Sequence, residues 1–162
     1  MVCAVGQTGC RSGVKTIDQL QLALQARGLT VERVEPTADE KRLMEKFRAM
    51  TFGLGVNYEE FVTLRIDGVE VEVTRYSGSM KARSEVKDQN ADEAQKARRK
   101  LENHERYDPT LNFSNGAFMF SIKHWTVSAA PGGTLDMGSY RSLDIDPAVE
   151  QRIESTVTAL KL

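Results

Sequence analysis

The chain has 162 residues, enough for one domain whose core removes about two-thirds of the unfolded surface from water. Apolar residues make up 40% and charged residues 28%, ordinary values for a globular protein that argue against a disordered or fibrous chain. The formal net charge is −1, so no basic excess indicates a nucleic-acid partner. No apolar run approaches the length that a membrane-spanning helix needs.

Residues 1–15 are predicted to form a flexible leader, followed by a single domain over residues 16–162. The stretch Val5–Cys10 (VGQTGC) ends in a small residue and a cysteine, as the tail of a bacterial lipoprotein signal does, which makes Cys10 a candidate for lipidation. Gln7 stands where such signals usually have leucine, and the preceding apolar run is short. Two interpretations stay open: a truncated signal, or a leader that carries none.

The two cysteines, Cys3 and Cys10, both lie in the first ten residues. Their spacing is not that of a zinc site, and His104 and His124 are the only histidines that could complete one. The sequence therefore predicts no metal site, and it shows no signature of a bound cofactor.

The domain is predicted to open with a helix, a short strand and a second helix. Thr16 with Gln19 forms a capping box, and Gly28 is well placed just past the end of the first helix. Leu29–Val34 has the pattern of a strand. Thr37–Met50 repeats the capping pattern and carries apolar side chains at helical spacing.

Phe61–Tyr76 (FVTLRIDGVEVEVTRY) predicts a β-hairpin around the Asp67-Gly68 turn. Pairing Ile66 with Val69 places six apolar side chains on one face: Val62, Leu64, Ile66, Val69, Val71 and Val73. The opposite face then pairs polar side chains, Arg65 with Glu70 and Thr63 with Glu72. Such a hairpin needs helices to cover its apolar face.

A long, strongly charged helical region is expected over residues 79–104, with a thin apolar stripe (Val86, Ala94, Ala97 and Leu101). Two alternatives stay open: one unbroken helix, or a break near Asp88–Asn90 where Asn90 and Glu93 would cap a second segment. Its basic run Lys96–Lys100 is interpreted as a solvated face rather than a phosphate-binding patch, because acidic residues surround it.

The last third of the chain predicts strands and a closing helix. Asn115-Gly116 indicates a second hairpin that leads into a strand over residues 118–127, and a last strand is expected over residues 139–145. Asp146 is expected to cap the final helix, with Pro147 as its first residue. Strands that come in hairpins predict an α+β fold with a mostly antiparallel sheet and helices packed on one face.

No nucleophile constellation appears, so candidate chemistry centres on His124. One hypothesis makes it a general base oriented by Asp136, Asp144 or Asp146; the other makes it a sheet histidine at the margin of the core. His124, Trp125 and Tyr140 are also candidates for a partner-binding patch beside a glycine-containing loop.

The opening Thr16–Leu20 (TIDQL), the segment Ala26–Val31 (ARGLTV), the hairpin Leu64–Val73 (LRIDGVEVEV) and Arg75-Tyr76 together resemble small secreted bacterial lipoproteins of unknown function. The resemblance covers residues 10–34 and 61–84. It implies an extracytoplasmic domain without known activity that is tethered to a membrane through a lipidated Cys10.

These observations predict a non-enzymatic protein-binding or interaction module, in the cell envelope if the resemblance holds. The alternative is a cytoplasmic inhibitor or regulator, of the mobile-element or immunity type, that binds a protein partner through the polar helix 79–104. An enzyme centred on His124 is the third hypothesis.

Overall fold

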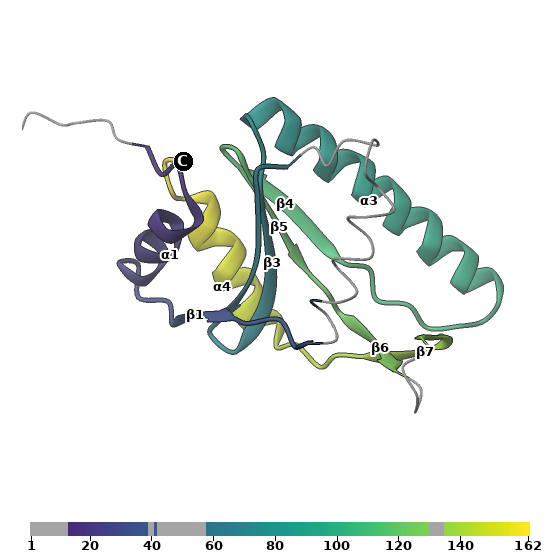
Figure 1. Ribbon diagram of the computed structural model, residues 1–162. Helices are drawn as coiled ribbons and strands as arrows, with labels where there is room; N and C mark the ends of the chain where they lie inside the picture. Colours follow the sequence, from purple (N-terminus) through teal and green to yellow (C-terminus); the bar gives the residue numbers. More distant parts are fainter. Residues whose placement is uncertain (1–12, 39–40, 42–57, 130–134) are drawn as a thin grey trace, which may run out of the picture.

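Figure 1 shows the fold as a computed structural model, which describes residues 13–38, 41, 58–129 and 135–162. Its elements follow in chain order: α1 (Ile17–Gln25), β1 (Val31–Val34), β2 (Glu60–Ile66), β3 (Val69–Arg75), α3 (Ser79–Glu102), β4 (Leu111–Asn115), β5 (Phe118–Ile122), β6 (Trp125–Ala129), β7 (Leu135–Ser142) and α4 (Pro147–Thr158). Strands β1 to β5 form one antiparallel sheet in the order β1-β2-β3-β5-β4, and β6 pairs with β7 in a second sheet. The fold is α+β with an antiparallel sheet, as predicted.

The central hairpin of β2 and β3 confirms the predicted register. Ile66 pairs with Val69, which leaves Asp67 and Gly68 as the turn residues, with φ of 47° and 86°. A two-residue turn of this type requires both residues in the left-handed region, which explains the Asp-Gly sequence. The Asp67 carboxylate also accepts a hydrogen bond from the Thr30 backbone N–H at 2.8 Å, so the turn holds the chain just before β1.

The main core lies between one face of the five-stranded sheet and the helices α1 and α4 (Figure 1). Alternate residues of β2, β3 and β5 point into it, as the two-residue period of a strand requires. Its fully buried side chains are Ile17, Leu20 and Leu24 from α1, Leu64, Ile66, Val71, Val73, Phe118, Phe120 and Ile122 from the sheet, and Ile153 and Val157 from α4. Burying each side chain of this size contributes about 1.5–3 kcal/mol.

The expectation that the helices share one face is wrong for α3, which packs on the opposite face of the sheet (Figure 1). The reason lies in β5, which is buried on both sides: Phe118 and Phe120 point into the main core, while Met119 points toward Ala82 of α3 in a second, smaller cluster. The predicted apolar stripe of α3 is also only partly correct. Leu101 is 74% exposed, and the buried residues of the helix are Ala82 and Glu93.

The predicted caps of α1 and α4 are confirmed. Thr16 Oγ1 accepts the backbone N–H of Gln19 at 3.2 Å, and Asp146 Oδ1 accepts that of Ala148 at 2.9 Å. Asn115 adds a contact that the sequence did not predict. Its side-chain amide donates to the backbone oxygens of Val157 and Leu160, each at 2.7 Å, and so holds the C-terminal end of α4 on the β4–β5 turn.

Several boundaries differ from the predictions. Of the two alternatives for the charged helix, the structure shows the unbroken one, α3 over Ser79–Glu102, with no break at Asp88–Asn90. The strand expected over 118–127 divides into β5 and β6 at Lys123-His124, and the last strand, expected over 139–145, is β7 at Leu135–Ser142. Most of the helix predicted over residues 37–50 lies outside the described residues. The structure gives one hydrogen bond at its start, from the Lys41 backbone N–H to the Thr37 backbone oxygen at 2.9 Å.

The predicted leader reaches into the described residues at its end. Val14 packs against the main core, and the backbone N–H of Lys15 donates to Gln19 Oε1 at 2.8 Å. Packing of the domain thus begins two residues before Thr16. Cys10 and the remainder of the leader lie outside the described residues.

The β4–β5 turn gives a test of local backbone strain. Asn115 pairs with Phe118, so the turn residues are Gly116 and Ala117, and Gly116 has φ of 58°. A Cβ at Gly116 would lie 2.9 Å from Leu162 atoms, whereas one at Gly68 meets nothing within 4 Å. Both positions carry the left-handed cost of about 1–2 kcal/mol. In urea unfolding, we expect Gly116→Ala to lower the free energy of unfolding more than Gly68→Ala does; equal losses would contradict the predicted clash.

Candidate functional site

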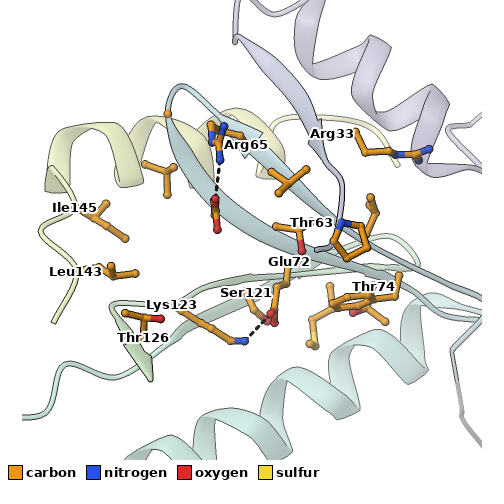
Figure 2. A pocket seen from close by; sticks show the side chains of 18 of the residues that line it. Arg33, Thr63, Arg65, Glu72, Thr74, Ser121, Lys123, Thr126, Leu143 and Ile145 are labelled. Carbon is orange, nitrogen blue, oxygen red and sulfur yellow. Dashed lines mark hydrogen bonds and ion pairs between the residues drawn. The ribbon is translucent and has the colours of Figure 1, made fainter. Parts of the chain in front are cut away.

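A broad groove runs over the second face of the sheet, beside α3; we call it the sheet groove (Figure 2). Its volume is about 1470 Å³. This volume is larger than that of usual small-molecule pockets, which measure roughly 300–1,000 Å³ and enclose most of their ligand. The floor is formed by outward-facing residues of β2, β3 and β5: Thr63, Arg65, Glu70, Glu72, Thr74, Ser121 and Lys123. The walls include Val34–Pro36 after β1, Gln89 of α3, and the segment Leu143–Asp146 before α4.

The charges on the floor are arranged by the strand register. Arg65 lies directly opposite Glu70 and pairs with it at 2.8 Å, and Lys123 reaches Glu72 at 2.5 Å (Figure 2). The hydrogen bond and the charge of Glu70 raise the pKa of Arg65. Exposed pairs of this kind contribute little to stability. Their effect on the groove is to neutralise the charges at its centre, where the uncharged hydroxyl group of Thr63 lies between them.

Aromatic side chains lie at both ends of the sheet groove. Tyr58 and Phe61 are neighbours, with ring centroids 6.2 Å apart, and Phe61 is 38% exposed. At the other end Trp125 is half-buried and lies 6.3 Å from Tyr107 between ring centroids. Exposed aromatic side chains around a polar floor are typical of protein-binding surfaces.

Tyr76 lines the same groove but is almost fully buried. Burial, with smaller contributions from Glu85 and Tyr58, raises the pKa of its phenol to about 12. The phenol therefore stays protonated at neutral pH and cannot act as a base. It supplies apolar surface and a hydrogen-bond donor to the groove.

The three predicted site residues are not brought together around the sheet groove. Trp125 lines it, whereas His124 faces the other way, toward Pro109 and Glu150. Tyr140 pairs with Val127 in the β6–β7 sheet, and its side chain lies outside what the structure describes.

The carboxylate beside His124 is Glu150, and neither Asp144 nor Asp146 is found in that position, while the side chain of Asp136 lies outside what the structure describes. Glu150 lies four residues after the cap of α4, so the turn of the helix carries it back over the β5–β6 junction. His124 is therefore bound at both ring nitrogens, and no hydroxyl of the sheet groove is its partner. Across the described ranges we find no nucleophile–base pair that would support the enzyme hypothesis.

The sheet groove carries an excess of acidic side chains. Seven of its lining residues are acidic and three are basic, but Glu70, Glu72, Glu60 and Asp67 are paired with Arg65, Lys123, Arg75 and Arg152. The excess therefore comes from the other three acidic residues of the lining, Glu35, Asp144 and Asp146. In the part of the chain that the structure describes, no three histidine, cysteine or acidic side chains gather in a way that could hold a metal ion.

Most of the floor was missed as a site in the sequence, although its signal was present. The alternation that fixed the apolar face of the hairpin also assigned Thr63, Arg65, Glu70 and Glu72 to the other face. What the sequence did not show is that β5 extends this polar face with Ser121 and Lys123, because the residues of β5 pair with residues of β3 that lie 43 to 51 positions earlier.

Comparison with known proteins adds no relative: no family model, curated protein or solved structure matches the chain. Among the described helices, none combines the length and the apolar character needed to cross a membrane.

Proposed function

We propose that this protein is a non-enzymatic interaction module that binds a basic segment of another polypeptide in the sheet groove. The single observation that carries the proposal is the groove itself, a volume of about 1470 Å³ with aromatic side chains at its ends and an excess of three acidic residues, Glu35, Asp144 and Asp146, beyond the ion-paired ones in its lining. A partner with lysine or arginine side chains would complement that excess. A groove of this size and shape suits a chain segment better than a compact small molecule.

The composition of the lining supports the same proposal. Phe61 and Trp125 provide apolar surface, and the hydroxyl group of Thr63 on the floor provides a hydrogen-bonding partner. The floor ion pairs are exposed, so a partner can exchange them for its own pairs at small energetic cost.

The alternative function is a regulator that contacts its partner through α3. This helix is 24 residues long, and its outer surface exposes Met80 and Leu101, at 83% and 74%. The two side chains lie near opposite ends of the helix and form no contiguous apolar patch, so this alternative rests on the long exposed polar surface between them. The two proposals place the partner on different parts of the molecule, so one experiment separates them.

The experiment is site-specific photocrosslinking in the native cell. A photoreactive amino acid is placed at Thr63 on the groove floor, at Arg98 on the exposed surface of α3, or at Gln151 on α4 as a control. The proposal expects Thr63 to give a heterologous polypeptide adduct that Gln151 does not give. The adduct is then digested, and the crosslinked peptide is sequenced to test whether it is rich in lysine and arginine.

Each other outcome contradicts the proposal in a specific way. An adduct from Arg98 alone supports the α3 alternative. A product from Thr63 within one chain, for example to residues 42–57, means that the protein itself occupies the groove. A crosslinked homodimer identifies a second copy as the occupant, and the absence of any adduct at Thr63 means that no polypeptide binds there.

Phe61 is the aromatic side chain whose loss should weaken binding most, because it is the most exposed one at the groove. We expect Phe61→Ala to lower the yield of the Thr63 adduct by about tenfold, the size expected for an aromatic hot spot. Leu101→Ala, which removes an exposed apolar side chain outside the groove, should leave it unchanged. The α3 alternative expects the opposite pattern.

The compartment is tested separately by the intact mass and N-terminal identity of the native protein, with its membrane and soluble fractions. A chain that begins at an acylated Cys10 supports a module tethered to the cell envelope. A chain that retains Met1–Gly9 in the soluble fraction contradicts the tether and favours a cytoplasmic regulator.

A further inference from the structure

His124 lies at a junction of four segments of the fold. It follows β5 and precedes β6, its backbone oxygen accepts the N–H of Leu143 at 2.7 Å, and its ring lies between the loop after α3 and the first turns of α4. The ring Nδ1 is 2.5 Å from the backbone oxygen of Pro109, and Nε2 contacts the carboxylate of Glu150. The side chains of His124 and Glu150 are only 21% and 22% exposed.

This geometry defines the protonation state that fits the site. A carbonyl oxygen and a carboxylate can only accept hydrogen bonds, so each ring nitrogen must donate. A neutral imidazole has one N–H and would leave a lone pair facing an acceptor oxygen. The doubly protonated imidazolium satisfies both contacts at once.

The charged surroundings of the ring favour the imidazolium. Glu150 from α4 and Asp108 from the loop after α3 are the carboxylates that act on it, while the neighbouring Lys123 reaches away to Glu72. Burial lowers the pKa of His124, but the Pro109 oxygen, the hydrogen bond and charge of Glu150, and the charge of Asp108 together raise it above the ordinary histidine value.

We propose that His124 is a proton-operated latch that fastens the first turns of α4 to the loop at Pro109 while both ring nitrogens carry protons. When the ring loses a proton, one of the two contacts loses its hydrogen bond, and the link between α4 and the loop opens. The latch is fully closed below the ordinary histidine pKa and opens as the pH rises through the elevated one.

The segment that the latch holds also lines the sheet groove. Ile145, Asp146 and Val149, which lie just before Glu150, form the end of the groove near Trp125. Opening of the latch would therefore free one wall of the groove. Only the effect of this opening on partner binding rests on the proposed function. The latch itself is a property of the folded chain and is tested without a partner.

The test is NMR of the folded protein across the titration of histidine. The ring nitrogen signals of His124 report its protonation, and the amides of Val149 and Glu150, which donate to Asp146 O, report the first turn of α4. We expect the ring to titrate above the ordinary histidine value. Protection of the two amides against exchange, corrected for the intrinsic effect of pH, should fall roughly tenfold over the same range.

The variant Glu150→Gln removes the charge but keeps the shape, and Glu154→Gln makes the same change one turn further along α4. The first should lower the His124 pKa and abolish the pH dependence of amide protection, whereas the second should change neither. Titration of wild-type His124 at or below the ordinary value overturns the latch. A His124 pKa that is the same in Glu150→Gln as in the wild type also overturns the latch. If Glu150→Gln does not fold, the wild-type titration alone decides the test.

Discussion

Replacing Phe120 by alanine should lower the free energy of unfolding by about 3–5 kcal/mol, the range measured for buried aromatic side chains. Phe120 is fully buried in β5, and its ring stacks on Phe113 at 5.2 Å between centroids and 11° between planes. The strand is covered on both faces, so its neighbours cannot move in to fill the space. Urea unfolding followed by circular dichroism measures the loss.

Phe61→Ala is the matched control, because it removes the same ring from β2, where the side chain is 38% exposed. We expect that change to cost about 1–2 kcal/mol, since more than a third of the side chain already faces water and its neighbours can close over the rest. Similar losses for the two variants would mean that β5 is not the centre of the core. They would also contradict the placement of α1 and α4 over the same face as Phe120.

The turns and caps could be predicted from the sequence because each depends on residues within about four positions. Asp67-Gly68 fixed the turn of the hairpin, and the alternation on either side then fixed its register. Thr16 and Asp146 were identified as caps because the requirement for an acceptor at the start of a helix is local. The fold class followed from the presence of hairpins.

The side of the sheet on which α3 packs could not be predicted in the same way. Helical periodicity counts apolar side chains, and α3 contacts the sheet through few of them. The rest of the contact is polar. Glu93 belongs to the helix that the sequence predicts to be largely solvated, yet its side chain is buried. The loop after the helix covers it and supplies hydrogen-bond donors from Tyr107 and Thr110.

The candidate site was predictable only in part, for a related reason. The floor of the sheet groove was implicit in the hairpin, and Trp125 was identified as a candidate. The walls come from Val34–Pro36 and Leu143–Asp146, which are more than 100 residues apart in the chain. His124 and Glu150, at a separation of 26, are likewise brought together only by the packing of α4. Patterns in a single sequence do not show which residues come into contact across such long separations.

A polar network under α3 takes the place of the missing apolar stripe. Ser121 Oγ donates to Asn112 Oδ1 at 2.7 Å, and the Asn112 side-chain amide donates to Asn90 Oδ1 at 3.1 Å. The Asn90 amide in turn donates to the backbone oxygen of Asn112 at 3.2 Å. Buried polar groups that are fully paired in this way add little net energy but fix one position of the helix on the sheet.

Glu93 is the member of this interface whose loss should cost most. Its carboxylate accepts hydrogen bonds from Tyr107 Oη at 2.7 Å, from the Thr110 backbone N–H at 2.8 Å and from Lys96 Nζ at 2.8 Å. Glu93→Ala removes a charged acceptor and leaves those donors without it, so we expect a loss of about 3 kcal/mol at neutral pH in urea unfolding. Glu102→Ala, on an exposed part of the same helix, should change stability by no more than about 0.5 kcal/mol.

The pH dependence of that loss separates a charge effect from a packing effect. Burial raises the pKa of Glu93, but the hydrogen bonds from Lys96, Thr110 and Tyr107, with the charge of Lys96, outweigh it and leave the pKa below the ordinary glutamate value. A depressed pKa contributes stability above the ordinary value, and that contribution disappears as the pH falls through the depressed one. The difference between wild type and Glu93→Ala should therefore shrink on acidification, whereas a constant difference would assign the whole effect to lost packing.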